Sequence, residues 1–488
     1  MDDWSAKRLL DRLAAGEISS VELVQQMLAR IESRNPALNA VVTLDADAAL
    51  AEAGKCDAER RRGQVRGPLH GLPITVKDTF ESRGLRTTAG SPEWAEHRPR
   101  TDAVAVARLR DAGAILVGKT NTAERAGDLQ CDNPLFGTTR NPWDTDRTSG
   151  GSSGGSAAAL AAGLTSLELG SDIGGSIRLP AHFCGVCGHK PSYGLVPLRG
   201  HLPGPPGWLA RSDLAVAGPM AREVADLRLA LDVLAGPDQT DAVAWRLSLP
   251  EPAAREPGQW RMAVWLQQPP FPLAREVLDR LQTTVAGLEA AGVVIDADAR
   301  PSGVDLAASH ELFYTMLAAA MSAGLSSEEM RFGRSLLKRK LTSEDGDRER
   351  FYRAAAMSHR HWQHLHEQRL QLATRWERFF RDWDVLLCPV APVNAFAHDL
   401  EGDPKDRRVL VDGHIRPYSD LSFWCGLAGL PYLPATVVPV GPGGDGLPVA
   451  IQVIGPRFGD HTTLAAAALI EQLVGGFRSP PGPFSMHA

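Results

Sequence analysis

The sequence has few cysteines, no long hydrophobic run and no surplus of basic residues. Six cysteines are scattered over 488 residues, which is not the pattern of a disulfide framework, so we expect reduced thiols. No apolar stretch reaches the roughly 18 residues that a membrane-spanning helix needs. The formal net charge of -6 lacks the positive field of a nucleic-acid binder. We therefore expect neither a membrane nor a nucleic acid as partner.

The N-terminal region is acidic at its start and then amphipathic. The start of the chain, from residue 1 to residue 4, lacks the basic n-region and the apolar h-region of a signal peptide. We therefore expect a cytoplasmic protein. Two helices are predicted within residues 4–34, because leucines recur at helical spacing and Ser19 with Glu22 forms a capping box. Pro36 is expected to stop the second helix.

The next region alternates between strand and helix patterns. Residues 72–76 and 114–117 are short apolar runs bounded by glycine and proline, which predicts strands, and residues 104–112 between them have a helical pattern. This β-α-β order favours a largely parallel or mixed sheet covered by helices. The expected fold class is therefore α/β.

The second half of the chain contains a long helical stretch. Residues 305–383 are helical, charged and aromatic, and we interpret them as an excursion from the sheet that ends at a strand, 385–388. The apolar runs 432–440 and 447–454 flank a glycine-rich turn, which predicts paired strands. A last helix is predicted at 462–473.

Two glycine- and serine-rich segments are the most unusual part of the sequence. Ser149–Ser156 lies directly before a predicted helix, where backbone N–H groups allow close approach of a ligand. Asp172–Arg178 contains two glycines followed by Ser176. Successive N–H groups beside a serine hydroxyl can form an oxyanion hole. Ser176 is therefore the candidate nucleophile.

A serine nucleophile needs a base, and Lys77 is the candidate. It follows the apolar strand 72–76, where loss of water lowers the pKa of an ammonium and leaves some neutral amine. The expected arrangement is lysine, relay serine and nucleophilic serine. The alternative interpretation, an ordinary exposed lysine, is weakened by the apolar run before it.

These segments together resemble the amidase signature family over roughly residues 5–475, least so in the middle helical region. The matching pieces are LHGLPITVKD ending at Asp78, AGAILVGKTNTAE from Ala112, GGSSGGSAAALAAG from Gly150, GSDIGGSIRLPA from Gly170 and AGLPYLPATVVPVG from Ala428.

The resemblance implies roles for individual residues. Lys77 is then the base, Ser152 the bridging serine on a cis Gly151–Ser152 peptide, and Ser176 the nucleophile that forms an acyl-enzyme. The implied oxyanion hole is made by the amides of Ile173, Gly174, Gly175 and Ser176, and the implied supporting residues are Ser153, Asp172 and Arg178. Arg178 is interpreted equally well as a salt-bridge partner of Asp172.

The resemblance also implies the fold and excludes a cofactor. A single domain is expected over 1–488, with a large mixed β-sheet core sandwiched between helices. Its parts are N-terminal helices (1–65), a catalytic core (66–300), a helical substrate-covering region (301–384) and a return to the core sheet (385–488). No metal or organic cofactor has a task in the implied chemistry, and a monomer or homodimer is expected.

Four local motifs favour other functions but lack the expected context. Gly150–Gly154 spells the GxSxG nucleophile elbow, which needs a preceding strand, whereas 141–149 is polar and turn-rich. Gly113–Thr120 fits the P-loop expression, but its middle is itself a predicted strand. A lone CxxC at Cys184 and Cys187 is weak support for metal or redox chemistry. The histidines at 359, 361, 364 and 366 are interpreted as a solvated helix face.

The substrate is expected to be neutral. Candidate substrate-binding residues are Gly127, Asp128, Leu129, Gln130, Phe313 and Trp424. The segments expected to determine specificity lean apolar at Leu129, Phe313, Tyr314, Met316, Phe423 and Trp424. We therefore predict cleavage of an amide, anilide or carbamate of a hydrophobic or aromatic small molecule. The alternatives are the glutaminase subunit of a tRNA-dependent amidotransferase and a non-catalytic binding protein of the same fold.

Overall fold

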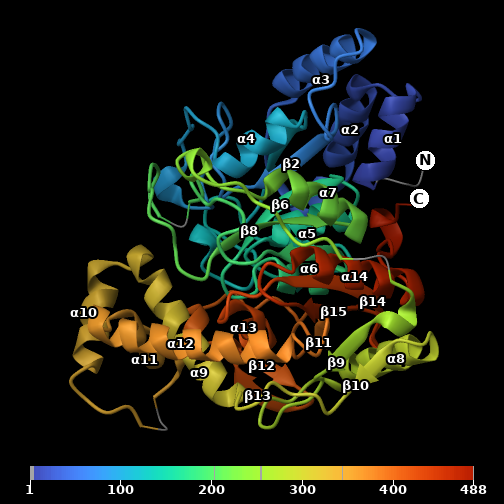
Figure 1. Ribbon diagram of the computed structural model, residues 1–488. Coiled ribbons are helices and arrows are strands. Elements are labelled where there is room, and N and C mark those ends of the chain that lie inside the picture. The colour runs from blue at the N-terminus through green and yellow to red at the C-terminus, as the bar shows by residue number, and fades with distance from the viewer. Residues whose placement is uncertain (1–4, 203, 253–254, 343–344, 487–488) are drawn as a thin grey trace.

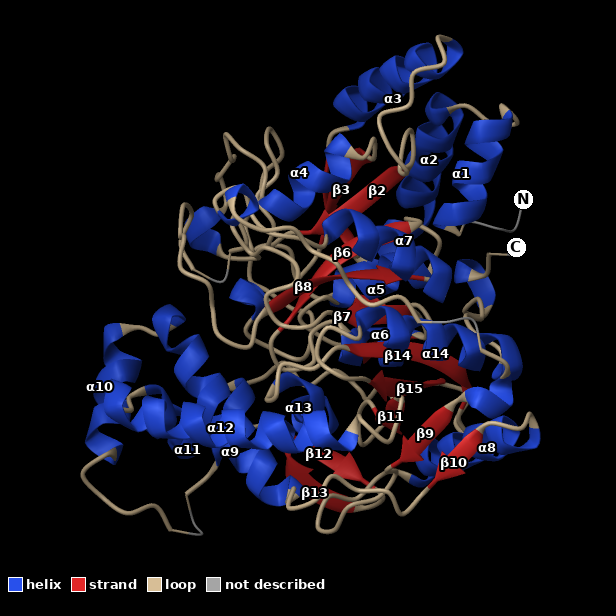
Figure 2. Cartoon of the chain, viewed as in Figure 1, coloured by secondary structure: helices blue, strands red, loops and turns tan. Residues whose placement is uncertain are grey.

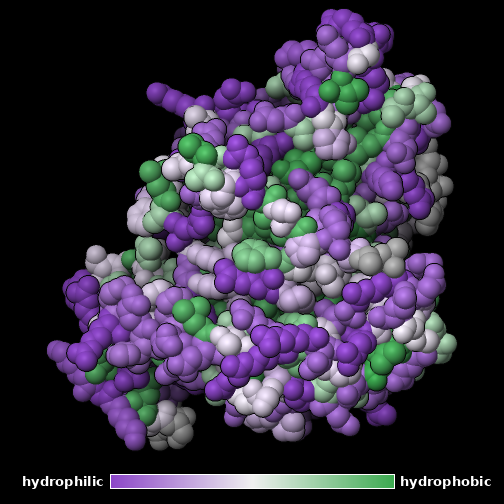
Figure 3. Space-filling model, viewed as in Figure 1, coloured by the Kyte–Doolittle hydropathy of each residue, from purple (hydrophilic) through white to green (hydrophobic). Residues whose placement is uncertain are grey.

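A computed structural model describes residues 5–202, 204–252, 255–342 and 345–486 of the chain. Residues 1–4, whose acidic character led us to expect no signal peptide, therefore lie outside the described residues. Within the described ranges, no helix combines the length and the apolar character needed to cross a bilayer. Figure 3 shows one face of the molecule, on which hydrophilic side chains predominate and hydrophobic ones are scattered.

The centre of the molecule is a mixed sheet of eight strands in the order β10-β9-β11-β15-β14-β7-β8-β6. Its outer strands β9, β10 and β11 are parallel to one another, and the remaining neighbours pair antiparallel. The predicted mixed α/β fold is therefore confirmed (Figure 2). The strands are β6 (Leu167–Asp172), β7 (Cys187–Lys190), β8 (Val216–Ala221), β9 (Arg261–Val264), β10 (Val294–Asp296), β11 (Val385–Pro389), β14 (Ala435–Pro442) and β15 (Pro448–Ile454).

A second, three-stranded sheet carries the candidate base. In it β1 (Val41–Leu44) and β2 (Pro73–Lys77) flank β3 (Ile115–Thr120), and β2 packs against β6 of the large sheet. Strands β2 and β3 are parallel and are joined through α4 (Val104–Asp111), as the β-α-β pattern predicts. Two further ribbons are β4 (Arg140–Asn141) with β5 (Asp144–Thr148), and β12 (Arg408–Val411) with β13 (His414–Pro417).

The N-terminal helices are α1 (Ala6–Ala15), α2 (Ser20–Leu38) and α3 (Ala46–Arg61). The capping box of Ser19 and Glu22 is present, but the prediction that Pro36 stops α2 is wrong. Pro36 lies in the last turn, and the helix ends where Asn39 adopts a left-handed φ of 54° and donates its N–H to the carbonyl of Asn35. Sequence patterns also missed β1 and α3. Helix α3 was missed because it has no one-sided apolar stripe.

The long helical excursion forms a group of its own beside the large sheet. It contains α9 (Leu306–Met321), α10 (Ser327–Leu336), α11 (Asp347–Ala355) and α12 (His359–Phe379), and Figure 1 shows this group at one side of the molecule. Helix α9 packs on α13 (Phe423–Gly429). This contact brings the excursion next to the segments that return from the sheet.

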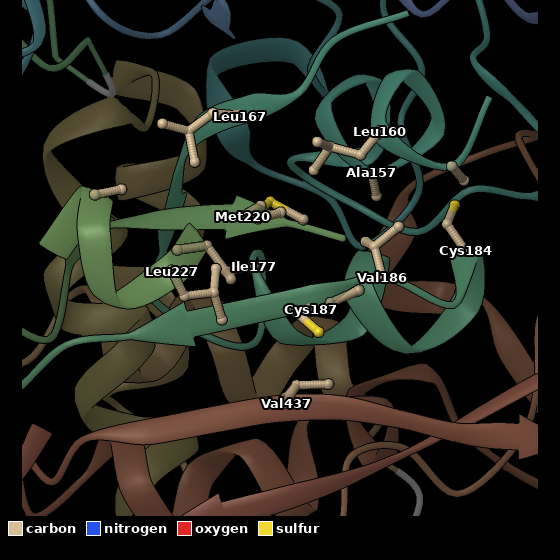
Figure 4. Close-up of a cluster of buried hydrophobic side chains, with 14 of the residues drawn as sticks. Ala157, Leu160, Leu167, Ile177, Cys184, Val186, Cys187, Met220, Leu227 and Val437 are labelled. Carbon is tan, nitrogen blue, oxygen red and sulfur yellow. The ribbon is translucent and has the colours of Figure 1, made fainter. Parts of the chain in front are cut away.

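The core is built on alanine-rich helices that can approach the sheet closely. Helix α5 (Gly154–Ala161) is fully buried and packs on β6 and α6 (Arg178–Cys184). Figure 4 shows Ala157, Leu160, Ile177 and Met220 among the side chains that fill this region. Small residues at a buried helix let backbones come together, so the two glycine-rich segments are held side by side. The remaining helices are α7 (Val224–Leu234), α8 (Arg275–Ala290) and α14 (Asp460–Val474).

Candidate active site

Lys77 ends a completely buried strand and is surrounded by serine hydroxyls. Its side chain is 0% exposed. The Nζ atom lies 2.6 Å from Ser152 Oγ, 3.0 Å from Ser153 Oγ and 3.0 Å from Ser171 Oγ. Strand β2 aims Lys77 at this group because it packs directly against β6, which carries Ser171. The arrangement places an amine within proton-transfer distance of a hydroxyl.

Burial determines the charge of this lysine. Loss of water lowers the pKa of Lys77 from 10.5 to about 7, although Asp172 acts in the opposite direction. Among the described residues, no carboxylate forms a salt bridge with Lys77. Near neutral pH, a large fraction of Lys77 is therefore uncharged and able to accept a proton.

The loop that carries Ser152 requires glycine at position 151. The Gly151–Ser152 peptide is cis, as the resemblance implies. A Cβ on Gly151 would lie 2.6 Å from the backbone nitrogen of Gln130, so a side chain there would collide with the neighbouring segment. The N–H of Ser153 donates to the carbonyl of Ser176 over 3.1 Å. This bond fixes the two glycine-rich segments to each other.

Asp172 organises the loop that carries Ser176. Its carboxylate accepts the N–H of Gly175 at 2.9 Å and that of Ile177 at 3.1 Å. The Arg178 guanidinium donates to the same carboxylate at 2.9 and 2.8 Å. Burial alone would raise the pKa of Asp172, but Arg178 outweighs it and the pKa is lowered to about 2. A permanent carboxylate thus holds the loop in its tight turn.

The loop leaves backbone donors free around the Ser176 hydroxyl. Of the four predicted oxyanion amides, that of Gly175 donates to Asp172 instead. The N–H groups of Ile173, Gly174 and Ser176 have no hydrogen-bond partner in the described part of the chain. Gly175 has a φ of 125°, a conformation that side chains rarely adopt. Three amides therefore remain available for an anion.

Two cavities meet at Ser176. The larger, of about 360 Å³, is lined by Ser152, Ser171 and Ser176 together with residues of the loop segments 198–202 and 204–215 and of 320–325. The smaller, of about 110 Å³, is lined by Gly174 and Ser176. Both also touch Ala126, Gly127, Ile173, Met321, Phe351 and Lys405. The excursion thus supplies one wall of the site.

The predicted substrate-binding residues divide into two groups. Gly127 lines both cavities, and Asp128 and Leu129 line the smaller one. Gln130, Phe313 and Trp424 line neither cavity. Gln130 is buried and exchanges hydrogen bonds with the backbone of Asp399, at 2.6 and 3.1 Å.

Phe313 and Trp424 belong to a separate hydrophobic cluster. Phe313 packs against Gly426, where a Cβ would lie 2.9 Å from the ring. Trp424 is 1% exposed and faces a different, small cavity beside Phe271. Apolar character on helices α9 and α13 therefore reflects core packing at these two positions.

Sequence reasoning missed Ser171 and His201. Ser171 contacts Lys77, and His201 lines the larger cavity. A signal existed only for Ser171, which directly precedes Asp172 in the matched motif. Nothing in the sequence around His201 distinguishes it from an ordinary loop residue.

The expectation that no strand precedes Gly150 is wrong. Strand β5 ends at Thr148, so the sequence Gly150–Gly154 does follow a strand. This strand pairs with β4 in a small antiparallel ribbon and is not part of the large sheet. The Ser152 hydroxyl contacts an amine instead of a histidine. The nucleophile-elbow interpretation fails on this contact.

None of the residues of the other local motifs lines either of the two cavities. Lys119 of the P-loop-like segment lies within β3, buried 3.5 Å from Asp78. Cys184 and Cys187 are buried free thiols, and burial raises the pKa of both. His359 and His366 stack on Trp362 along α12.

The comparison with known proteins follows the same segments. The family model named Amidase matches residues 22–464. The chain belongs to the amidase family. A glutamyl-tRNA(Gln) amidotransferase subunit from Synechococcus sp. (strain CC9605) is 35% identical, over 98% of this chain and 98% of that protein.

Solved structures extend this likeness to the fold. One, described as a vestigial protein complex that reveals the evolutionary origins of an s-triazine catabolic enzyme, has 30% identity, a TM-score of 0.79 and coverage of 97% of this chain and 99% of its own. A bacterial aryl acylamidase of the amidase signature enzymes has 25% identity, a TM-score of 0.78 and 96% coverage of both chains. This chain is an amide-hydrolysing enzyme of the same family.

Proposed function

We propose that this amidase cleaves its substrate through an acyl-enzyme on Ser176, with Lys77 as base and Ser152 as relay. The observation that carries the proposal is the contact of the buried Lys77 amine with Ser152 Oγ at 2.6 Å. Ser152 in turn lines the same cavity as Ser176. A serine hydroxyl becomes a competent nucleophile only when a neighbouring group removes its proton.

The proposed reaction moves one proton back and forth. Neutral Lys77 takes the proton of Ser152 while Ser152 takes that of Ser176, and Ser176 Oγ bonds to the carbonyl carbon. The free amides of Ile173, Gly174 and Ser176 then donate to the oxyanion. The proton returns through Ser152 to the departing nitrogen, the C–N bond breaks, and water releases the acyl group by the reverse relay.

The charges around the two cavities support a neutral substrate. Each charged side chain among the described lining residues already has an oppositely charged partner, which weakens its attraction for an ionic group of the substrate. The most buried of these pairs are Asp172–Arg178, Asp213–Arg369 and Asp128–Arg407, at 2.8, 2.9 and 2.6 Å. The lining groups Arg125, Arg211, Lys405 and Asp347 form more exposed pairs, with Glu93, Asp241, Asp403 and Arg350.

A second candidate function comes from the relatives that are named as glutamyl-tRNA(Gln) amidotransferase subunits. Glutamine carries an ammonium and a carboxylate, and its recognition requires charged groups that are free to pair with them. The pairing of the lining charges disfavours this substrate. We therefore prefer a neutral amide, anilide or carbamate.

A substrate panel tests the proposal. Purified enzyme is given anilides, primary amides, carbamates, esters and glutamine, with Ser176→Ala as the control for contaminating hydrolases. We expect turnover of neutral amides or carbamates and none of glutamine. Preferred hydrolysis of free glutamine, or ammonia transfer to a charged tRNA with co-purified subunits, would overturn the choice of substrate.

A further inference from the structure

The two cavities at Ser176 differ in which catalytic group they contain. Ser152 lines only the larger cavity, and Gly174 lines only the smaller one. This difference matters because, in the proposed relay, Ser152 delivers the proton to the leaving nitrogen. The inference therefore rests on the proposed function.

Proton delivery decides where each half of the substrate lies. An amide nitrogen leaves only after it is protonated, and that proton comes from Ser152. The leaving nitrogen must therefore lie within reach of Ser152 Oγ, on the side of the larger cavity. The oxyanion faces the free amides of Ile173, Gly174 and Ser176. Because the leaving nitrogen takes the larger cavity, the acyl substituent is left with the other space at Ser176, which is the smaller cavity.

The volumes of the cavities then limit each half. An apolar cavity of about 150 Å³ is sufficient for a benzene molecule. The acyl side, at about 110 Å³, is below this size. The amine side, at about 360 Å³, is more than twice this size and has the rings of His201, Trp208 and Phe351 in its wall.

His201 is a polar group of this wall without a hydrogen-bond partner among the described residues. It is 8% exposed, and neither of its ring nitrogens has a partner in that part of the chain. The Nε2 atom is itself enclosed, so a ligand in the cavity reaches the ring at Nδ1. Burial lowers the pKa of His201 to about 3, so the ring is neutral. Its backbone is fixed next to the lysine strand, because Leu202 N–H donates to Thr79 O and Glu81 N–H donates to Gly200 O, at 2.7 and 2.9 Å.

We propose that the larger cavity is the leaving-group subsite, that it accepts an aromatic amine bearing a polar substituent while the acyl group is small, and that His201 is the specificity-determining residue that hydrogen-bonds this substituent. A neutral buried imidazole without a partner gains a hydrogen bond from such a ligand and stays unsatisfied with a plain ring.

Two isomeric amides test the direction of binding. Acetanilide has a small acyl group and an aryl amine, and N-methylbenzamide has the reverse. Each enzymatic kcat/KM is divided by the rate of alkaline hydrolysis of the same amide in water, which removes the difference in leaving-group reactivity. We expect acetanilide to be preferred by about 10-fold or more. Equal rates or preference for N-methylbenzamide overturns the subsite assignment.

A second pair tests His201. We expect wild-type enzyme to prefer 3-hydroxyacetanilide over acetanilide by about 3- to 10-fold, and His201→Phe to abolish this ratio. His310→Phe is the matched control, since His310 is also a buried neutral histidine with an unpartnered ring nitrogen but lines neither cavity. A ratio that survives in His201→Phe, or that is also lost in His310→Phe, overturns the role of His201.

A burst of p-nitrophenol from p-nitrophenyl acetate counts the folded, acylatable sites of every variant and normalises these rates. A normal burst without hydrolysis of either isomer overturns the subsite assignment alone. Absence of the burst in wild-type enzyme overturns the proposed function itself.

Discussion

Replacing Lys77 by methionine should make the protein more stable and the enzyme nearly inactive. A pKa of about 7 leaves about half of the Lys77 amines neutral at pH 7, against about one in 3000 for an ordinary lysine. Lowering the pKa from 10.5 to about 7 costs the folded state about 5 kcal/mol below pH 7. The three serine contacts of Nζ offset about 1 kcal/mol each. The net expected gain for Lys77→Met is about 2 kcal/mol.

The stability difference between Lys77→Met and wild type should depend on pH. Between pH about 7 and 10.5 the folded state binds fewer protons at Lys77 than the unfolded state, so wild-type stability rises with pH across this window. The advantage of the methionine variant should therefore shrink by about 2–3 kcal/mol between pH 6.5 and pH 9. Urea unfolding of both proteins at the two pH values measures this difference.

Activity is measured as kcat/KM against pH on the best substrate of the panel. In wild-type enzyme it should rise with pH through about 7, because the neutral amine is the active form, and in Lys77→Met it should fall by about 10²- to 10⁴-fold. Lys190→Met is the control. Burial also lowers the pKa of Lys190 to about 7, but its Nζ donates to the carbonyl of Pro191 and contacts no serine of the site, so its variant should keep the wild-type inflection. A wild-type profile without an inflection near 7, or one that survives in Lys77→Met, would refute the reasoning.

Three further substitutions test the surrounding site. Ser176→Ala should lose both turnover and covalent labelling by a fluorophosphonate while its circular dichroism stays that of wild type. Asp172→Asn leaves the buried Arg178 without its carboxylate, so urea unfolding should show a loss of about 3–5 kcal/mol, and an unchanged midpoint would contradict the role of this pair. Burial raises the pKa of Glu168 to about 7, so wild-type stability falls as pH rises from 4.5 to 7. Glu168→Gln should remove up to about 3 kcal/mol of that dependence, and identical pH profiles of stability would contradict it.

Local chemistry made part of the fold predictable. The capping box at Ser19 and the glycine turn between β14 and β15 both depend on residues close together in the sequence, and both are present. The prediction that Pro36 stops α2 failed because a proline in the last helical turn removes only one hydrogen bond. The helix ends at Asn39 instead. Strand β5 was missed because all five of its residues are polar, so this small, half-buried ribbon has no apolar pattern to indicate a strand.

The site was predictable only where a motif carries it. Lys77, Ser152 and Ser176 come from three separated segments. In the structure Ser152 and Ser176 line one cavity, and the buried Lys77 amine lies 2.6 Å from Ser152 Oγ. The cavity walls follow no such pattern. Phe313 and His201 illustrate this, since the apolar ring is buried in a core and the loop histidine faces the cavity. Wall residues are selected by how distant segments pack, which short-range periodicity does not encode.

The position of Arg178 explains how an amine can stay neutral near a carboxylate. Asp172 is close enough to favour the charged form of Lys77, yet both of its oxygens are occupied by Arg178 and by loop N–H groups. Arg178 is 0% exposed and also donates to Gln452 Oε1 at 2.9 Å, so it cannot swing away. If Asp172 paired with Lys77, the ammonium would be stabilised and the base lost. The guanidinium therefore protects the lysine's neutrality while it shapes the loop that presents Ser176.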